Sequence, residues 1–216
     1  AASIALGLLL AAKTDLVVLL AGAACFIIGV LYTAGPVPIS RQPQGEILSG
    51  IFYGLFIPFI LLYINMPHGE LMSLSIGAQA VDLSLSVKPI ISLLFLSIPP
   101  VFTTANIMLA NNICDVEKDV LSKRYTLPYY IGKKALWLFA ALYYLIYPAC
   151  IVMVILGILP LISLLSLLTV FYVHKNISIF FKKQDKATTF IVSIKNYIAI
   201  MSSNVIMLFI GALIGI

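Results

Sequence analysis

The chain has 216 residues, of which 62% are hydrophobic and 10% are charged, and its mean hydropathy is +1.12. A soluble protein of this length cannot hide so much apolar surface in one core, so the composition indicates an integral membrane protein. The net charge of +5 is modest, and no basic patch with interleaved aromatic residues suggests a nucleic-acid partner. The three cysteines form no CxxC pair or Cys/His cluster, so neither a zinc site nor a disulfide framework is supported.

Seven apolar runs follow one another along the chain, at 2–12, 16–33, 47–65, 89–110, 135–157, 159–177 and 196–216. Within lipid every backbone polar group needs a partner inside the segment, so each run is expected to be a helix. The predicted fold class is therefore all-α, a polytopic transmembrane helical bundle that forms one domain over residues 1–216. The first run is shorter than the roughly 20 residues that span a bilayer, and we expect it to be a clipped helix of a longer protein.

Two details of this bundle are expected from local residue types. Pro99 and Pro100 lie in the fourth run, where they remove backbone donors and predict a kink. The segment 66–87, between the third and fourth runs, is too polar to span and is expected to form an interfacial helix or a loop.

The loops between the runs alternate in charge. Eleven of the 13 basic residues fall in 34–46, 111–134 and 174–195, whereas only Lys13 and Lys88 fall in the other set. The positive-inside rule places the basic loops in the cytoplasm. The charged end of the bundle is therefore expected to face the cytoplasm.

Charged residues gather in the window 111–134, NNICDVEKDVLSKRYTLPYYIGKK, which holds three of the eight acidic and five of the 13 basic residues. On a helix, Asn111, Asp115 and Asp119 share one face because they are spaced four residues apart. Two carboxylates one turn apart suit a hard divalent cation such as Mg²⁺, and Asn111 can add a neutral oxygen.

Lys123 and Arg124 follow these carboxylates, and such side chains bind phosphate well. The window therefore fits a Mg²⁺–diphosphate complex held at the membrane surface. A solvated loop of mixed charge is the alternative interpretation, because DxxxD alone is a weak signal.

The same window resembles the second Asp-rich motif of the UbiA superfamily of intramembrane prenyltransferases. The family pattern runs N-[ND]-x-x-D-x-x-x-D, then a basic cluster, then Thr-Leu and a glycine before a basic residue. The matching positions are Asn111, Asp115, Asp119, Arg124, Thr126, Leu127 and Gly132. Lys123 departs from the pattern, because many members have glycine there.

A second stretch, YTAGPVPISRQPQGEILSGIFYG at 32–54, is similar to a segment of the 1,4-dihydroxy-2-naphthoate branch of this superfamily. The matching residues are Tyr32, Gly35, Pro36, Pro38, Gly45, Glu46 and Gly54. Both motifs lie on the side that the charge pattern makes cytoplasmic, and the resemblance extends over essentially the whole chain.

The resemblance implies nine transmembrane helices and two Asp-rich motifs, whereas seven runs and only the second motif are present here. The chain is therefore expected to begin at the third helix of the family, as an N-terminally truncated prenyltransferase domain. The implied reaction transfers a polyprenyl group from a Mg²⁺-bound polyprenyl diphosphate to an aromatic acceptor. In the naphthoate branch the acceptor loses its carboxylate and demethylmenaquinone forms, a step of menaquinone biosynthesis.

The implied partners are polyprenyl diphosphate, an aromatic acceptor and the lipid bilayer. The implied location is the cytoplasmic membrane of a bacterium. Within the resemblance, Asp115 and Asp119 are the expected catalytic metal ligands, with Asn111 in support. Lys123 and Arg124 are the expected catalytic contacts to the diphosphate.

Four further residues are candidates for substrate binding. Asn112 is the neighbour of Asn111 but faces about 100° away from it on a helix. Tyr32 and Arg41 could meet the donor or acceptor, although an interfacial aromatic residue and a positive-inside anchor explain them equally well. Asn106, five residues before Asn111, could line a cavity within the fourth run.

Other functions remain open at this level. A polytopic transporter would place ionisable residues at mid-membrane, and no run has one at its centre. The missing first motif leaves a non-catalytic fragment as an alternative. Among enzymes, acceptors such as 4-hydroxybenzoate, homogentisate or a porphyrin are also compatible with the motifs.

Overall fold

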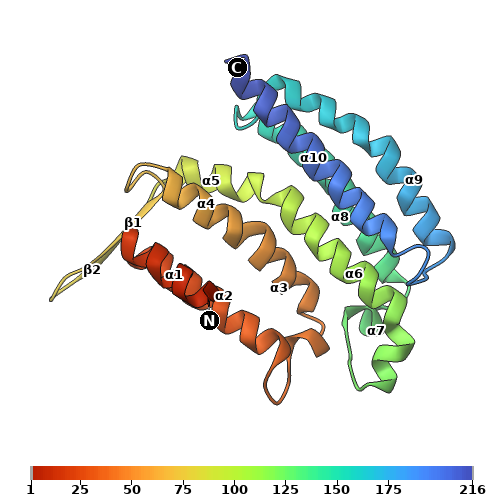
Figure 1. Cartoon of the computed structure of the whole chain (residues 1–216). Coiled ribbons are helices and arrows are strands. Elements are labelled where there is room, and N and C mark those ends of the chain that lie inside the picture. Colours follow the sequence, from red (N-terminus) through yellow and green to blue (C-terminus); the bar gives the residue numbers. More distant parts are fainter. Residues whose placement is uncertain (1, 216) are drawn as a thin grey trace.

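The computed structural model describes residues 2–215 as a bundle of helices that lie side by side (Figure 1). All seven apolar runs are helical. The first, α1 (Ala2–Lys13), is a short apolar helix of 12 residues. Six longer helical segments are long and apolar enough to cross a membrane, at Leu16–Thr33, Gly45–Asn65, Val87–Leu121, Lys134–Ile155, Leu161–Lys182 and Ile191–Leu213. The expected all-α polytopic bundle is confirmed.

The N-terminal part of the bundle consists of α1, α2 (Leu16–Thr33) and one long composite helix. After the short 3-10 turn η1 (Ile39–Arg41), the composite helix runs through α3 (Gly45–Ile51), the π-helical turn η2 (Phe52–Phe56) and α4 (Ile57–Asn65). It packs tightly on α6 (Ile98–Leu121) through two glycines, Gly50 and Gly54. A Cβ at Gly50 would lie 2.9 Å from the carbonyl oxygen of Val101, so only glycine permits this approach.

The fourth run is divided as the proline pair predicts. The helix α5 (Val87–Leu96) ends before Ser97, and α6 begins at Ile98 with Pro99 and Pro100 in its first turn. The hydroxyl of Thr103 donates to the carbonyl oxygen of Pro99 at 2.7 Å. Beyond the break, α6 continues as far as Leu121 and carries half of the charged window on a regular helix.

The segment between α4 and α5 contains a β-hairpin rather than the expected interfacial helix or loop. Its strands are β1 (Met72–Ile76) and β2 (Val81–Leu85), which pair antiparallel. The physical reason is a two-residue period in the sequence, MSLSI and VDLSL, which favours a strand over a helix.

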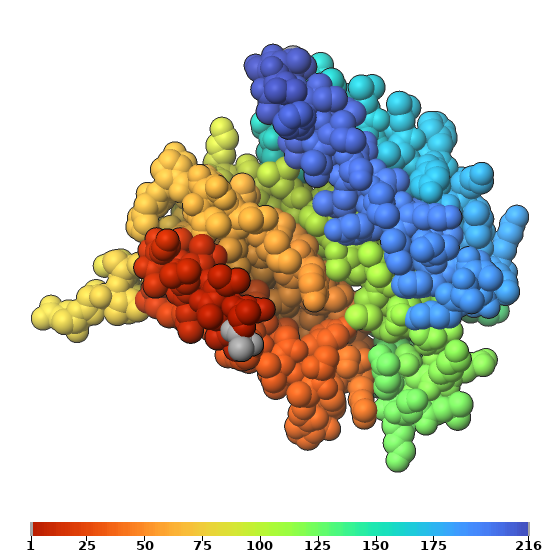
Figure 2. Space-filling model, in the orientation of Figure 1, coloured from red at the N-terminus to blue at the C-terminus, as the bar shows by residue number. Residues whose placement is uncertain are grey.

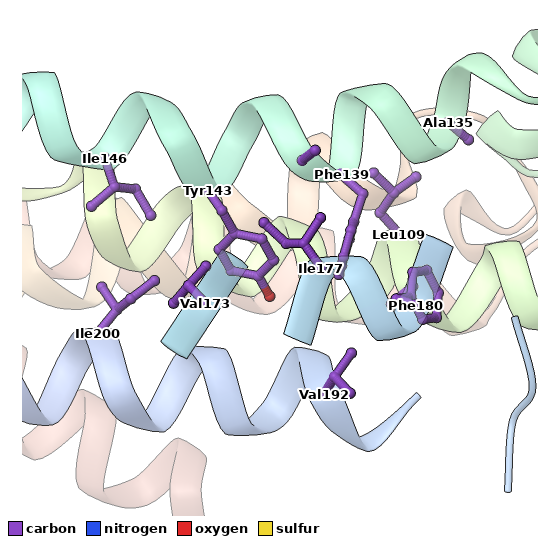
Figure 3. Close-up of a cluster of buried hydrophobic side chains, with 12 residues drawn as sticks. Leu109, Ala135, Phe139, Tyr143, Ile146, Val173, Ile177, Phe180, Val192 and Ile200 are labelled. Carbon is purple, nitrogen blue, oxygen red and sulfur yellow. The ribbon is translucent and has the colours of Figure 1, made fainter. Parts of the chain in front are cut away.

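The C-terminal part contains the most completely buried core, between α6, α8 (Lys134–Ile155), α9 (Thr169–Lys182) and α10 (Ile191–Leu213) (Figure 3). The short helix α7 (Leu127–Ile131) precedes α8, and the 3-10 helix η3 (Leu161–Leu168) leads into α9. Phe139, Tyr143 and Phe180 are fully buried, and the ring centroids of Phe139 and Phe180 lie 4.7 Å apart. This aromatic packing holds α6 in place from one side, while the two glycines hold it from the other.

Candidate functional site

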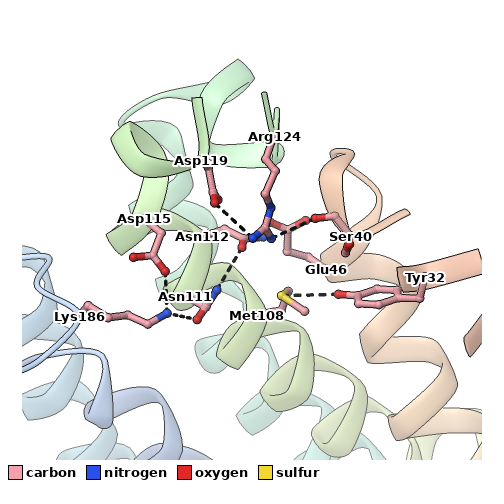
Figure 4. Close-up of polar contacts among 10 residues, drawn as sticks. All are labelled: Tyr32, Ser40, Glu46, Met108, Asn111, Asn112, Asp115, Asp119, Arg124 and Lys186. Carbon is pink, nitrogen blue, oxygen red and sulfur yellow. Dashed lines mark hydrogen bonds and ion pairs between the residues drawn. The ribbon is translucent and has the colours of Figure 1, made fainter. Parts of the chain in front are cut away.

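Three connecting segments meet at one end of the bundle, which we call the site end. They are the α2–α3 connection (34–44), the segment after α6 (122–126) and the α9–α10 connection (183–190), and they surround the C-terminal half of α6 (Figure 4). These segments belong to the three basic loops of the sequence. The site end therefore collects the charge that the rest of the bundle excludes.

On α6, Asn111, Asp115 and Asp119 share one helix face, as their spacing predicts, but two different cations hold them. The ammonium group of Lys186, from the α9–α10 connection, donates to Asp115 Oδ2 at 2.7 Å and also to the side-chain oxygen of Asn111. Arg124 pairs with Asp119, with 3.4 Å between Nη1 and Oδ1. Each predicted metal ligand is thus already in contact with positive charge.

Lys186 belongs to a connection that several local hydrogen bonds hold together. The side chain of Asp185 accepts hydrogen bonds from the backbone N–H (2.8 Å) and the hydroxyl of Thr188 (2.6 Å), and these hold the pKa of this carboxyl below its ordinary value. The hydroxyl of Thr189 bridges within the same turn, accepting from the Asp185 N–H at 2.8 Å. Lys186 also lies over the ring of Phe190, 4.8 Å from the centroid, so its ammonium group has an aromatic neighbour as well as carboxylate partners.

The chain turns sharply after α6 to bring Arg124 back to the site. Lys123 has φ +56°, the left-handed conformation that glycine adopts most easily, which explains glycine at this position in the family motif. The backbone N–H of Arg124 then donates to the carbonyl oxygen of Asp119 at 2.8 Å. Within residues 2–215 the Lys123 side chain makes no hydrogen bond or ion pair and is exposed, so it is free to meet a ligand from solution.

The α2–α3 connection docks on this turn through its backbone. Arg124 Nη2 donates to the carbonyl oxygen of Ser40 at 3.2 Å, and the N–H of Tyr125 donates to the carbonyl oxygen of Arg41 at 3.0 Å. The guanidinium group of Arg41 is itself exposed. Arg41 therefore belongs to the site end by its position, whereas its side chain contributes no contact to the cluster of carboxylates among the described residues.

Asn112 joins Asn111 to a carboxylate, Glu46, for which the sequence predicted no role. Although the two asparagines were expected to face about 100° apart, their side chains meet, because Asn111 Nδ2 donates to Asn112 Oδ1 at 3.3 Å. The side-chain nitrogen of Asn112 donates to Glu46 Oε1 at 2.8 Å, across the α3–α6 contact. Glu46 is only 3% exposed, and its other oxygen, Oε2, has no hydrogen-bond partner in the described structure. Asp119 is in the same situation, 6% exposed with Oδ2 unpaired. Buried carboxylate oxygens without partners are costly, which is typical of sites that bind a ligand.

An apolar cavity of about 460 Å³ lies between α2 and the composite helix, and Met108 of α6 closes it. The hydroxyl of Tyr32 lies 3.7 Å from the sulfur of Met108, and both residues line the cavity. Figure 4 shows this pair beside the residues of the charged cluster. The other lining residues are Cys25, Ile28, Gly29, Thr33, Leu48, Ser49, Phe52, Tyr53 and Ile57. Tyr32 thus links an apolar cavity to a charged surface.

Asn106 does not line this cavity. It is fully buried between α6 and α8, and its nitrogen donates to the carbonyl oxygen of Phe139 at 3.0 Å. The structure thus places Asn106 in a helix–helix contact, away from the other candidate residues.

The side chains present suit a hard divalent cation in chemical type. Asp115, Asp119 and Asn111 offer oxygen ligands on one face, and the unpaired Oδ2 of Asp119 is available. Across residues 2–215, however, no group of three or more His, Cys, Asp or Glu side chains gathers as a metal site. A bound metal ion would therefore need further oxygen ligands from phosphate or water, as Mg²⁺ usually does.

Two residues of this site, Glu46 and Lys186, have no role predicted from the sequence. Glu46 left a signal in the Gly-Glu pair of the second motif, whereas Lys186 was counted only as one of the basic loop residues. Lys186 is 71 positions from Asp115, and nothing local in either segment indicates the pairing.

Comparison with known proteins identifies the family of the chain. The model of the UbiA prenyltransferase family matches residues 1–197. The chain is 32% identical over 156 residues to the 1,4-dihydroxy-2-naphthoate octaprenyltransferase of Bacillus subtilis (strain 168), an alignment that covers 72% of this chain. It spans 44% of the length of that relative. No solved structure matches the chain at a significant level. With an apolar helical bundle, an Asp-rich face on α6 and a family match over nearly its whole length, this chain belongs to the UbiA prenyltransferase family.

Proposed function

We propose that the chain takes part in transferring a polyprenyl group from polyprenyl diphosphate to an aromatic acceptor, most specifically 1,4-dihydroxy-2-naphthoate, to give demethylmenaquinone. One observation carries the proposal: a cluster of carboxylates paired with cations on α6 lies beside an apolar cavity. A polyprenyl diphosphate has the same division, with a charged head and an apolar tail. The naphthoate acceptor is supported by the second sequence motif and by the Bacillus subtilis relative.

At the charged head, Asp115, Asp119 and Asn111 would hold Mg²⁺. When bound, the ion would neutralise the charge that develops on the departing diphosphate. Lys123 and Arg124 lie beside this face and would contact phosphate oxygens directly. Lys186 contacts Asp115, so its ammonium group would move toward the phosphates if this carboxylate bound the ion.

At the apolar end, the cavity between α2 and the composite helix would take the first part of the prenyl tail. Its walls carry no charged side chain, so they would shield an allylic cation from water. Tyr32 stands where tail and head would meet, which suits a role in orienting the donor or the acceptor. The bond between the prenyl carbon and the diphosphate oxygen would break here and release diphosphate. A bond from the prenyl carbon to the aromatic ring would form, and the acceptor carboxylate would leave as CO₂. The direct product is then the quinol, which becomes demethylmenaquinone when a separate oxidant removes two electrons.

These assignments place the reaction at a membrane surface. The chain is an integral membrane protein, and its bacterial relative suggests the cytoplasmic membrane. The eleven basic residues of the site-end loops support a cytoplasmic orientation for the reaction. Transport is disfavoured by the family match and by the absence of an ionisable side chain at the middle of any described span.

The test is an assay with the protein expressed from its complete reading frame in bacterial membranes. Labelled polyprenyl diphosphate is offered with 1,4-dihydroxy-2-naphthoate, with and without EDTA. Replacing Asp115→Asn or Asp119→Asn should lower kcat by about 10²–10³-fold, the loss typical of removing one charge-stabilising group. Asp82→Asn, in the remote hairpin, is the matched control and should keep full activity.

Two results would change the proposal. Transfer to 4-hydroxybenzoate, homogentisate or a porphyrin but not to the naphthoate would retain prenyl transfer and reject the naphthoate assignment. No transfer to any aromatic acceptor from a well-folded preparation would reject prenyl transfer and favour a non-catalytic chain.

A further inference from the structure

The β1–β2 hairpin has one apolar face and one polar face. Its register pairs Met72 with Leu85, Leu74 with Leu83 and Ile76 with Val81, whereas Ser73 pairs with Ser84 and Ser75 with Asp82. Directly paired residues lie on the same face of a two-stranded sheet, and faces alternate along each strand. All six apolar residues therefore form one face, and three serines and an aspartate form the other. We call these the apolar face and the serine face.

Most of the apolar face is exposed, along β2 and at the end of β1 nearest the turn. Four of its side chains are more than half exposed, namely Ile76 (62%), Val81 (64%), Leu83 (57%) and Leu85 (53%). In Figure 2 the hairpin stands clear of the helices, to the left of the body. An isolated two-stranded hairpin is marginal in water, so a covered face is needed to keep it ordered.

The base of the hairpin is fixed at the membrane boundary. The strands follow α4 and precede α5, both parts of membrane-spanning segments, at the end of the bundle opposite the site end (Figure 1). Leu71 is buried at the base, and the N–H of Ser86 donates to its carbonyl oxygen at 3.1 Å. The hairpin is therefore anchored at the ends of two membrane-spanning segments, at the level where the bilayer surface is expected.

We propose that the hairpin lies in the interfacial zone of the bilayer, with the apolar face toward the acyl chains and the serine face toward water. It cannot sit deeper, because its open strand edges carry backbone groups that hydrocarbon leaves unpaired. The strands contain a single charged residue, Asp82, which lies on the serine face. Contact with the membrane is therefore apolar, and it needs no particular headgroup charge.

The experiment compares matched tryptophans on the two faces. Trp137 is the single tryptophan of these 216 residues, so the chain carrying Trp137→Phe provides a silent background. Leu83→Trp and Ser84→Trp, neighbours on β2, are reconstituted in bilayers with brominated acyl chains and titrated with aqueous acrylamide. Val81→Trp and Asp82→Trp form a second pair, so the test does not depend on one substitution folding. Size-exclusion chromatography and circular dichroism establish that each variant keeps the bundle.

Bromolipid quenching severalfold stronger at Leu83→Trp than at Ser84→Trp, with the reverse order for acrylamide, is the expected result. It should be the same in zwitterionic and anionic bilayers. Equal acrylamide access at both positions without bromolipid quenching would place the hairpin in water and overturn the proposal. Protection of Leu83→Trp from both quenchers would also overturn it, because protein, such as a second copy of the chain, would then cover the apolar face. Protection only in anionic bilayers would contradict the apolar basis of the contact.

Discussion

Two clusters of ionisable side chains lie at opposite ends of the bundle, and they differ in how completely their carboxylates are hydrogen-bonded. At the end near the hairpin, Asp15 caps α2, and its Oδ1 accepts from the N–H groups of Val17 (2.9 Å) and Val18 (3.3 Å). Its Oδ2 accepts from the hydroxyl of Tyr63 and lies 3.4 Å from Nε2 of His68. Both oxygens of Asp15 are therefore used within the protein.

At the site end, two carboxylates are more deeply buried yet less completely paired. Glu46 and Asp119 each keep one oxygen without a partner in the described structure, although each contacts Asn112 or Arg124 through the other. An unpaired buried acceptor destabilises the fold unless a partner is supplied, and a bound cation or a ligand donor would supply one. The comparison supports the proposal that the α6 cluster binds a ligand, whereas both oxygens of Asp15 are used within the fold.

The largest change in stability and in metal binding should follow from disrupting the helix contact that holds Glu46 against α6. Gly54→Leu places a side chain against the backbone of Val101, and overpacking of this kind typically costs about 1–3 kcal/mol. Displacement of the Glu46–Asn112 pair should weaken Mn²⁺ binding at the same time. Thermal midpoints in detergent and Mn²⁺ titrations followed by electron paramagnetic resonance measure both. Gly7→Leu is the control, since a Cβ there meets no atom within 4 Å; equal losses in the two variants would contradict the explanation.

A smaller effect, confined to stability, is expected from the Asp15 cluster. Asp15→Ala removes the α2 cap and the partner of Tyr63 and His68, and loss of such a cap costs about 1 kcal/mol. Prenyl transfer and Mn²⁺ affinity should be unchanged, because this cluster is at the other end of the bundle. The thermal midpoint and the Mn²⁺ affinity are both measured for Asp15→Ala and for the control variant, Asp82→Ala. A fall in Mn²⁺ affinity without loss of stability would show that the Asp15 cluster contributes to metal binding, and would contradict the prediction.

The smallest effect should come from Lys186. Lys186→Met frees Asp115 and Asn111 from a bound ammonium group, so Mn²⁺ should bind more tightly in the absence of diphosphate. A partly exposed ion pair is worth up to about 1 kcal/mol, so a gain of roughly two- to five-fold in affinity is expected. Lys183→Met is the matched control in the same connection, because Lys183 faces Asp185 at 3.5 Å. Weaker Mn²⁺ binding in Lys186→Met would mean that the lysine organises the metal ligands rather than competing for them.

Much of the bundle could be predicted because the signals are local. Long apolar runs, the proline pair before the break at Ser97 and the four-residue spacing of Asn111, Asp115 and Asp119 all act within a few turns of chain. The hairpin was also encoded locally, by the alternation of leucine and serine, but the segment was expected to be an interfacial helix or loop because it is too polar to span. The error was one of period: every second residue is apolar there, whereas a helix repeats every three or four.

By itself, then, the sequence determined a polytopic helical membrane protein, the charged loops at one end and an Asp-rich helix face within them. Only the tertiary structure decided which cation each carboxylate meets: Lys186 for Asp115, Arg124 for Asp119, with Asn112 turned to Glu46. The physical reason is that helix periodicity is set by neighbours in the chain. Pairings such as Asp115 with Lys186 and Asn112 with Glu46 join residues 71 and 66 positions apart, and they exist only once α3, α6 and the α9–α10 connection have packed together.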